Sequence, residues 1–182
     1  GSGEVDAKIV EEYRAGKHVV DIVDGTQLHL LLREQGVLQP FSSPNLAAID
    51  EAGITKAPGG GAFSAVFRFS GIGWAYNTKL MPKEELPKTY QDLLDPKWKG
   101  KMALPGENTP VNWMGTLLKT YGEEFVKRIA QQNFTIQTFS ARALLDLMIA
   151  GEYTCSPVIY DSHVFSSRAK GAPVDWVPLE PV

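Results

Sequence analysis

Three stretches of the sequence place polar side chains at predicted helix starts, where they could bind an anion. The first turn of a helix exposes free backbone N–H groups and a partial positive charge, so it attracts negative ligands. The same stretches could be plain capping turns, because Ser, Thr, Asp and Asn side chains accept hydrogen bonds from those N–H groups. The stretches are Asp24-Gly25-Thr26, Gly106-Glu107-Asn108-Thr109 and Ser140-Ala141-Arg142. From the first two stretches we predict ligand contacts by Gly25, Thr26, Glu107, Asn108 and Thr109.

Arg142 is the most informative residue of the third stretch. A cation in the first turn of a helix opposes the helix dipole by about 0.3–1 kcal/mol. Arg142 is therefore misplaced locally unless an anion or a carboxylate compensates its charge. It could also be a solvated side chain or half of a structural ion pair. We take it as the best single candidate for an anion contact.

Two further pairs of residues close β-rich runs. Tyr160 and Asp161 carry phenol and carboxylate oxygens, which are hard ligands that could hold a hard cation, although a tyrosine at a strand end also packs well. Tyr76 and Asn77 stand at the predicted junction between two lobes, where they could reach a ligand. Asn77 could equally serve only to form the turn.

Composition and motifs argue against several other function classes. The net charge is −3 with both signs interspersed, whereas a nucleic-acid binder needs a basic stripe. No run approaches the roughly 18 apolar residues of a membrane span. Cys155 is the only cysteine, which excludes an intramolecular disulfide and zinc sites of paired cysteines. No Gly-x-Ser-x-Gly or His-Glu-x-x-His motif occurs, but the fold class alone leaves a cytosolic α/β enzyme as an alternative.

The elements that must position these residues follow an α/β order. Periodic apolar residues predict a first helix that ends at Gly16. The sequence then predicts a strand at residues 18–23, a helix at 27–35 and a loop at 40–63. Two further strands are predicted at 64–69 and 72–76. Strands and helices alternate afterwards, with strands at 101–104, 134–139, 153–160 and 174–179 and helices at 109–121, 122–132, 141–149 and 162–168. An α/β sheet usually begins with a strand, so the first part is expected to lack an earlier segment.

Several motifs in this order resemble the bacterial extracellular solute-binding proteins of ABC importers. The most specific are Tyr76-Asn77-Thr78-Lys79 and Leu93-Leu94-Asp95-Pro96-Lys97-Trp98-Lys99-Gly100. Weaker matches are Glu12-Tyr13-Arg14-Ala15-Gly16-Lys17, Val20-Asp21-Ile22-Val23 and Ala150-Gly151-Glu152. The family includes binders of ferric ion, polyamines and phosphonates or sugar phosphates.

The resemblance implies a periplasmic binding protein-like α/β fold of type II, with two lobes of mixed sheets that close on a ligand by a hinge. On this pattern residues 1–77 form an incomplete first lobe, 78–175 form the second lobe, and 176–182 begin the return crossover. Uncovered sheet edges of the incomplete lobe then predict a dimer.

The resemblance also implies what the protein binds and where it works. It predicts a non-enzymatic component that delivers a small polar or anionic ligand to a membrane permease from the periplasm or the cell exterior, with a lipid anchor as one mode of attachment. A ferric ion would be a transported ligand and not a cofactor. Ferric binders place paired tyrosines where this chain has one tyrosine, Tyr160, followed by Asp161. A ligand-sensing receptor domain of the same fold is the alternative function.

Overall fold

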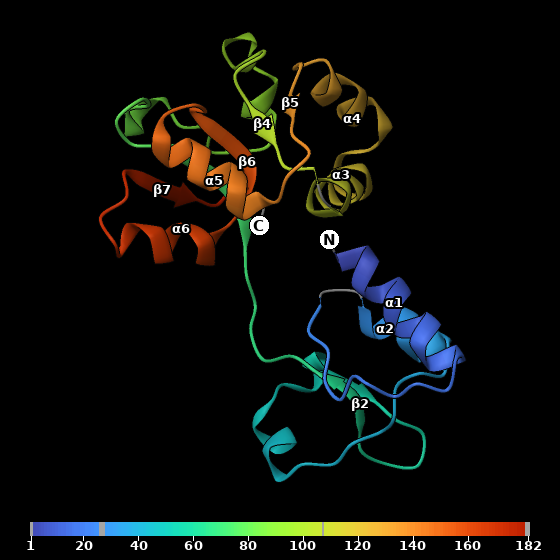
Figure 1. Cartoon of the computed structure of the whole chain (residues 1–182). Helices are drawn as coiled ribbons and strands as arrows, with labels where there is room; N and C mark the ends of the chain where they lie inside the picture. Colours follow the sequence, from blue (N-terminus) through green and yellow to red (C-terminus); the bar gives the residue numbers. More distant parts are fainter. Residues whose placement is uncertain (1, 26–27, 107, 181–182) are drawn as a thin grey trace. The chain divides into compact units, whose positions relative to one another are not determined.

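The computed structural model describes residues 2–25, 28–106 and 108–180. The chain forms two compact units, Gly1–Phe69 and Ser70–Val182, which we call unit 1 and unit 2. Figure 1 shows both units with their elements labelled. Among the described residues, none of the helices is long and apolar enough to cross a membrane.

Among the described residues, unit 1 contains the α-helices α1 (Ser2–Arg14) and α2 (Leu28–Glu34). The predicted stops at Gly16 and Gly36 are confirmed, because both glycines adopt the left-handed conformation that ends a helix, with φ of 71° and 68°. The buried side chains of Ile9 and Leu32 form the small core that joins the two helices.

A hairpin of two antiparallel strands, β1 (Ile54–Lys56) and β2 (Ala62–Ala65), follows two short 3₁₀ helices at Pro44–Ala48 and Glu51–Gly53. The loop predicted over 40–63 is thus partly wrong, since it contains β1. Its glycine-rich part is the turn of the hairpin. Gly61 is required there: its φ is 76°, and a Cβ atom would lie 2.5 Å from the carbonyl oxygen of Phe41.

The strand predicted over residues 18–23 is wrong. The segment has no regular structure, and Val19 and Ile22 are 70% and 89% exposed. β-branched residues favour a strand only where a neighbouring strand pairs with it and a core covers one face. No described strand pairs with this segment, so the local preference has no effect.

Unit 2 is built on a three-stranded antiparallel sheet with the order β6-β3-β7. Its strands are β3 (Ile72–Asn77), β6 (Cys155–Tyr160) and β7 (Val174–Val177). Two shorter strands, β4 (Ala103–Leu104) and β5 (Thr135–Ile136), pair in parallel, and a parallel bridge from Met102 to Cys155 connects β4 to β6. The mixed sheets of the predicted fold class are therefore confirmed.

In the part of unit 2 that the structure describes, four α-helices and three 3₁₀ helices accompany the strands. The α-helices are α3 (Asn108–Tyr121), α4 (Glu123–Ala130), α5 (Ala141–Ala150) and α6 (Asp161–Arg168). The 3₁₀ helices are η3 (Lys83–Glu85), η4 (Gln91–Leu94) and η5 (Pro96–Trp98). Each α-helix coincides with one predicted from the sequence. Strand β3 belongs to unit 2, because the boundary between the units lies between Phe69 and Ser70, whereas the expected lobe boundary lies after Asn77. The division of a longer protein into lobes stays a prediction.

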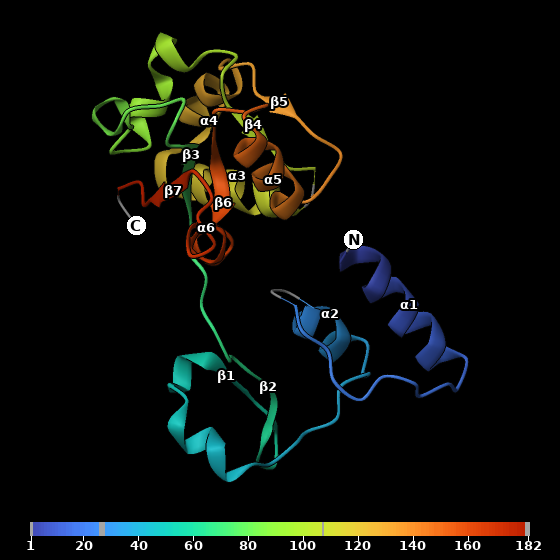
Figure 2. The same ribbon diagram turned by 60° about the vertical axis from the view of Figure 1, so that its left-hand side comes forward.

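The central sheet of unit 2 is covered on both faces. Neighbouring residues of a strand point to opposite faces, and Trp74 and Ala75 accordingly belong to different core clusters. Trp74 packs with residues of α3 and α4 such as Leu117 and Ile129, and Ala75 packs with residues of α5 such as Leu144. Figure 2 shows α5 and α6 beside the sheet from a second direction.

Candidate ligand-binding site

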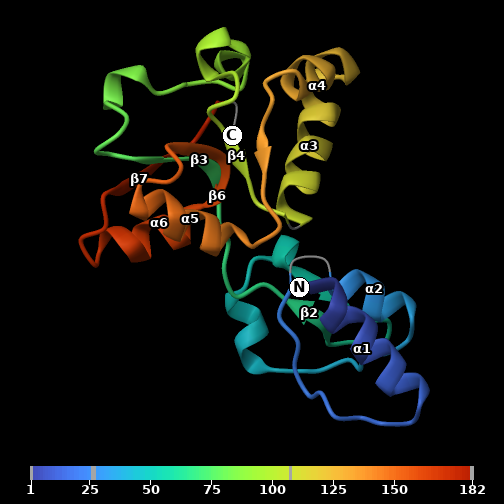
Figure 3. The same ribbon diagram turned by 45° about the horizontal axis from the view of Figure 1, so that its top comes forward.

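Helices α3, α5 and α6 all begin on one side of unit 2, as Figures 1 and 3 show. A backbone hydrogen bond of 2.9 Å from Gly106 N–H to the carbonyl oxygen of Phe139 joins the loop before α3 to the loop before α5. Gly106 is needed for this approach, because a Cβ atom would lie 2.0 Å from the carbonyl oxygen of Gln137. The loops that lead into α3 and α5 are thus tied together at this side.

The start of α3 contacts the end of β6 through two hydroxyl groups. Thr109 Oγ1 and Tyr160 Oη lie 3.1 Å apart and share a hydrogen bond. Thr109 is buried and Tyr160 is half-buried. The ring of His163 lies edge-on to the Tyr160 ring, with 5.4 Å between the ring centroids. We call Thr109, Tyr160 and His163 the polar cluster; its hydroxyl groups can donate to or accept from a polar ligand.

Asp161 stabilises the start of α6. Its backbone N–H donates to the carbonyl oxygen of Gly71 at 3.0 Å, and its carboxylate accepts from the N–H of Ser162. The hydroxyl of Ser162 lies 3.4 Å from that of Ser70. An acidic residue in a first turn also interacts favourably with the helix dipole. The carboxylate of Asp161 therefore has a structural role, and its predicted ligand role stays a prediction.

The start of α5 is partly capped by a side chain. Ser140 Oγ accepts from the N–H of Ala143 at 3.3 Å, which is a capping bond. Arg142 pairs with Asp146, one turn further along α5, and donates to Ser167 Oγ of α6 at 2.9 Å. Of the alternatives for Arg142, the structural ion pair is present. An anion contact by its exposed guanidinium stays a prediction.

Tyr76 and Asn77 are buried within unit 2. Asn77 is 2% exposed; its Nδ2 donates to the carbonyl oxygen of Met148 at 2.7 Å, and its Oδ1 accepts from Lys79 N–H at 2.8 Å. Tyr76 is 3% exposed, and burial raises the pKa of its hydroxyl above 10.0. The bond from Lys79 N–H shows that Asn77 forms the turn, one of its two alternatives. Ligand contacts by Tyr76 and Asn77 stay predictions.

The remaining predicted contacts divide between the two units. Asn108 is the first residue of α3 and is exposed beside Thr109, whereas Gly25 is exposed in unit 1, before α2. Thr26 and Glu107 lie outside the described residues. His163 was not predicted as a site residue. Its position three residues after Tyr160, where side chains of a first helical turn gather on one face, was the available signal.

The side chains at this site do not form a dense metal-ligand group. Within residues 2–25, 28–106 and 108–180, no group of three or more His, Cys, Asp and Glu side chains could hold a metal ion. Cys155, a potential soft ligand, is buried in the core, and burial raises its pKa to about 12. The described site therefore combines hydroxyl groups with helix starts, a chemistry suited to a polar or anionic guest.

The chain belongs to the bacterial extracellular solute-binding proteins, a family that matches residues 18–178. The family predicted from the sequence motifs is thus confirmed, as is its periplasmic binding protein-like α/β fold. Proteins of this family bind solutes outside the cytoplasm and are not enzymes. A comparison with curated proteins finds no match.

Solved structures of solute-binding proteins share the fold. Iron-bound HitA from Pseudomonas aeruginosa is 21% identical, with a TM-score of 0.72 over 97% of this chain and 57% of that one. AfuA from Actinobacillus pleuropneumoniae with bound fructose-6-phosphate is 24% identical, with a TM-score of 0.75 over 98% and 59%. A substrate-binding protein of an ABC transporter from Agrobacterium tumefaciens is 17% identical, with a TM-score of 0.79 over 96% and 54%. This chain therefore spans less than two thirds of each of these relatives.

Proposed function

We propose that the chain is the ligand-binding part of the substrate-binding component of an ABC importer. It captures a small polar or anionic ligand by hinge closure and passes it to a membrane permease from the periplasm or the cell exterior. The observation that carries this proposal is the hydrogen bond between Thr109 and Tyr160, because it joins two predicted ligand contacts at the starts of α3 and α6. Family membership supports the same function.

An anionic ligand fits the described residues better than a bare metal ion. Three helix starts on one side of unit 2 supply N–H groups and partial positive charge, whereas no cluster of metal-ligating side chains occurs among the residues described. HitA was solved with iron and AfuA with fructose-6-phosphate, so both ligand classes deserve a test. A ferric ion would use the oxygens of Tyr160 and Asp161 and would need an accompanying anion.

Calorimetry with fructose-6-phosphate, ferric citrate, a phosphonate and spermidine tests the proposal on the whole chain. Tyr160→Phe removes one hydroxyl and keeps the ring, so we expect the affinity for the best ligand to fall about five- to tenfold, the value of one hydrogen bond. Tyr121→Phe is the matched control, since it removes a hydroxyl at the other end of α3. Equal affinities of wild type and Tyr160→Phe would refute the site.

A ligand-sensing receptor domain is the second candidate function. A structure described as a two-component system protein that mediates signal transduction is 17% identical, with a TM-score of 0.63 over 98% of this chain and 67% of that one. Both candidates bind ligand stoichiometrically and without turnover. They differ in the responding partner. Stimulation of ATP hydrolysis by a reconstituted permease complex supports the importer, and stimulation of a sensor kinase supports the receptor.

Attachment and assembly are also proposals. Lipid anchoring would place the ligand-binding part beside its permease. The dimer is proposed from the uncovered sheet edges that an incomplete first lobe would leave. Sedimentation of the whole chain measures this directly, and a monomer at high micromolar concentration rules the dimer out.

A further inference from the structure

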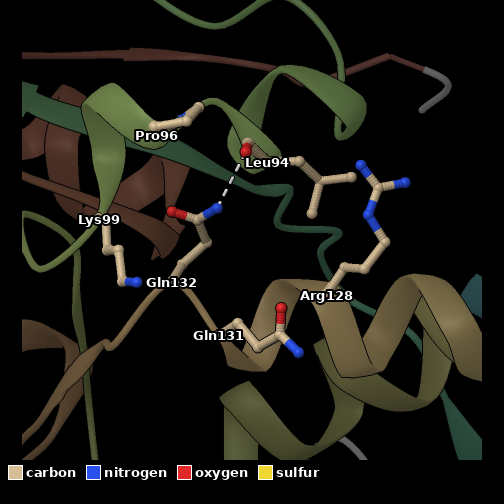
Figure 4. A pocket seen from close by; sticks show the side chains of 6 residues that line it. All are labelled: Leu94, Pro96, Lys99, Arg128, Gln131 and Gln132. Atoms are coloured by element: carbon tan, nitrogen blue, oxygen red, sulfur yellow. Dashed lines mark hydrogen bonds between the residues drawn. The ribbon is translucent and has the colours of Figure 1, made fainter.

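Unit 2 has a pocket of about 210 Å³ that no residue of the polar cluster lines. It lies between the segment with η4 and η5 and the end of α4, and it is lined by Leu94, Pro96, Lys99, Arg128, Gln131 and Gln132 (Figure 4). Local bonds fix both walls. The carboxylate of Asp95 caps η5 by accepting from Lys97 N–H at 2.9 Å, and Gly100 N–H donates to the carbonyl oxygen of Gln132 at 2.8 Å.

Gln132 gives this pocket an acceptor that lacks a donor. The residue is 7% exposed, and its Nε2 donates to the carbonyl oxygen of Leu94 at 3.0 Å. Its Oε1 is buried and has no hydrogen-bond partner among the described residues. Figure 4 shows Oε1 turned away from Leu94, toward the side of Pro96 and Lys99. A buried acceptor without a donor is costly, so a donor that enters the pocket and reaches Oε1 is favoured.

Two cations stand at the rim of the pocket. Lys99 and Arg128 are exposed, and neither forms an ion pair with a residue that the structure describes. Figure 4 shows their side chains on opposite sides of Gln132. Lys127, the neighbour of Arg128 on α4, is instead paired with Glu123 and Glu124. The pocket therefore attracts negative charge, while Leu94 and Pro96 add apolar surface.

We propose that this pocket is a docking site for an acidic peptide segment of a partner protein. The backbone N–H of the segment donates to Gln132 Oε1, and its Asp or Glu side chains pair with Lys99 and Arg128. A peptide brings a neutral N–H donor and a carboxylate on one short chain, whereas a carboxylate alone brings only acceptors. The site is independent of the ligand-binding function proposed above.

Titration of the ¹⁵N-labelled whole chain with the blocked peptide acetyl-Gly-Glu-Gly-Glu-Gly-amide tests this proposal by NMR. We expect saturable shifts of the amide signals of Gly100, Gln131 and Gln132. The variants Lys99→Gln and Arg128→Gln should each weaken binding about three- to fivefold, the effect of an exposed ion pair. Lys127→Gln is the matched control on the same helix, and it should bind as tightly as wild type because Lys127 is already paired.

Several outcomes would overturn the docking site. They are the absence of saturable shifts, equal shifts with the Gln counterpart of the peptide, and equal weakening by Lys127→Gln. Inorganic phosphate serves as the probe for a small-anion site. Saturation of the same signals by phosphate at lower concentration than by the peptide would replace the peptide with a free anion as the occupant.

Discussion

Asn77→Ala should destabilise unit 2 by about 2–3 kcal/mol. The substitution removes a buried hydrogen bond, the donation to Met148 at 2.7 Å, and a partly buried one, the acceptance from Lys79 at 2.8 Å, each with a net value of about 0.5–1.5 kcal/mol. It also leaves a small cavity at a position that is 2% exposed. The carbonyl oxygen of Met148 keeps the N–H of Gly151 as a partner, so the loss stays within this range.

Urea unfolding followed by tryptophan fluorescence measures this change. All four tryptophans lie in unit 2, so the signal reports on that unit. Ligand affinity, extrapolated to the folded fraction, should be unchanged, because both polar groups of the Asn77 side chain are engaged inside the unit. A loss of affinity without a loss of stability would restore Asn77 as a ligand contact and refute this reasoning.

The variant Asn77→Asp should make the stability of unit 2 depend on pH. The carboxylate replaces the donor to Met148 with a buried charge, so burial raises the folded pKa above the unfolded value of about 3.9. The folded state then binds the proton more tightly, and stability increases as the pH falls. The loss of stability relative to wild type is largest above the folded pKa of the new carboxyl group. It decreases as the pH falls from the folded pKa to the unfolded pKa. A pH profile parallel to that of wild type would contradict the burial of this side chain.

Three further predictions concern packing and reactivity. Because burial raises the pKa of Cys155 to about 12, its thiol at pH 8 should react with a disulfide reagent at least about 100-fold more slowly than in urea; equal rates would contradict its burial. Gly106→Ala should lower the free energy of unfolding by more than about 2 kcal/mol, because the added Cβ atom clashes with Gln137. Gly115→Ala on α3 should raise it by about 0.5–1 kcal/mol, because the space around its Cβ position is free. Urea titrations measure both changes. Tyr121→Phe removes a buried hydroxyl without a partner and should leave the melting temperature unchanged or raised, so a lowered value would contradict it.

The elements of unit 2 could be predicted because their signals are local. Glycines end or separate helices at positions that require a positive φ, such as Gly122 at 82° and Gly151 at 90°. Periodic apolar residues between those stops define the helices. The strand order β6-β3-β7 was not predicted, since pairing depends on residues far apart in the sequence. The false strand at 18–23 has the same origin: its composition is right, but no described strand lies beside it.

The candidate site was predictable in its parts and not in its contacts. Thr109 and Tyr160 were each predicted from their place at a helix start or a strand end, yet their hydrogen bond joins two separate motifs. Arg142 was predicted to need a negative partner. Asp146 has the i,i+4 spacing of a helical ion pair, so the sequence already contained the partner that the structure shows.

The hydrogen bonds at the helix starts also limit how tightly unit 2 can hold a ligand by itself. Ser140 and Asp161 accept from N–H groups of their own helices, and Thr109 and Tyr160 bond to each other. A ligand that uses these groups replaces existing hydrogen bonds, and such an exchange yields a small net free energy. High affinity must then come from contacts that other parts of the protein add when the ligand is bound. The proposed capture by hinge closure would meet this requirement, since a ligand stabilises a closed state only through contacts that the open state lacks.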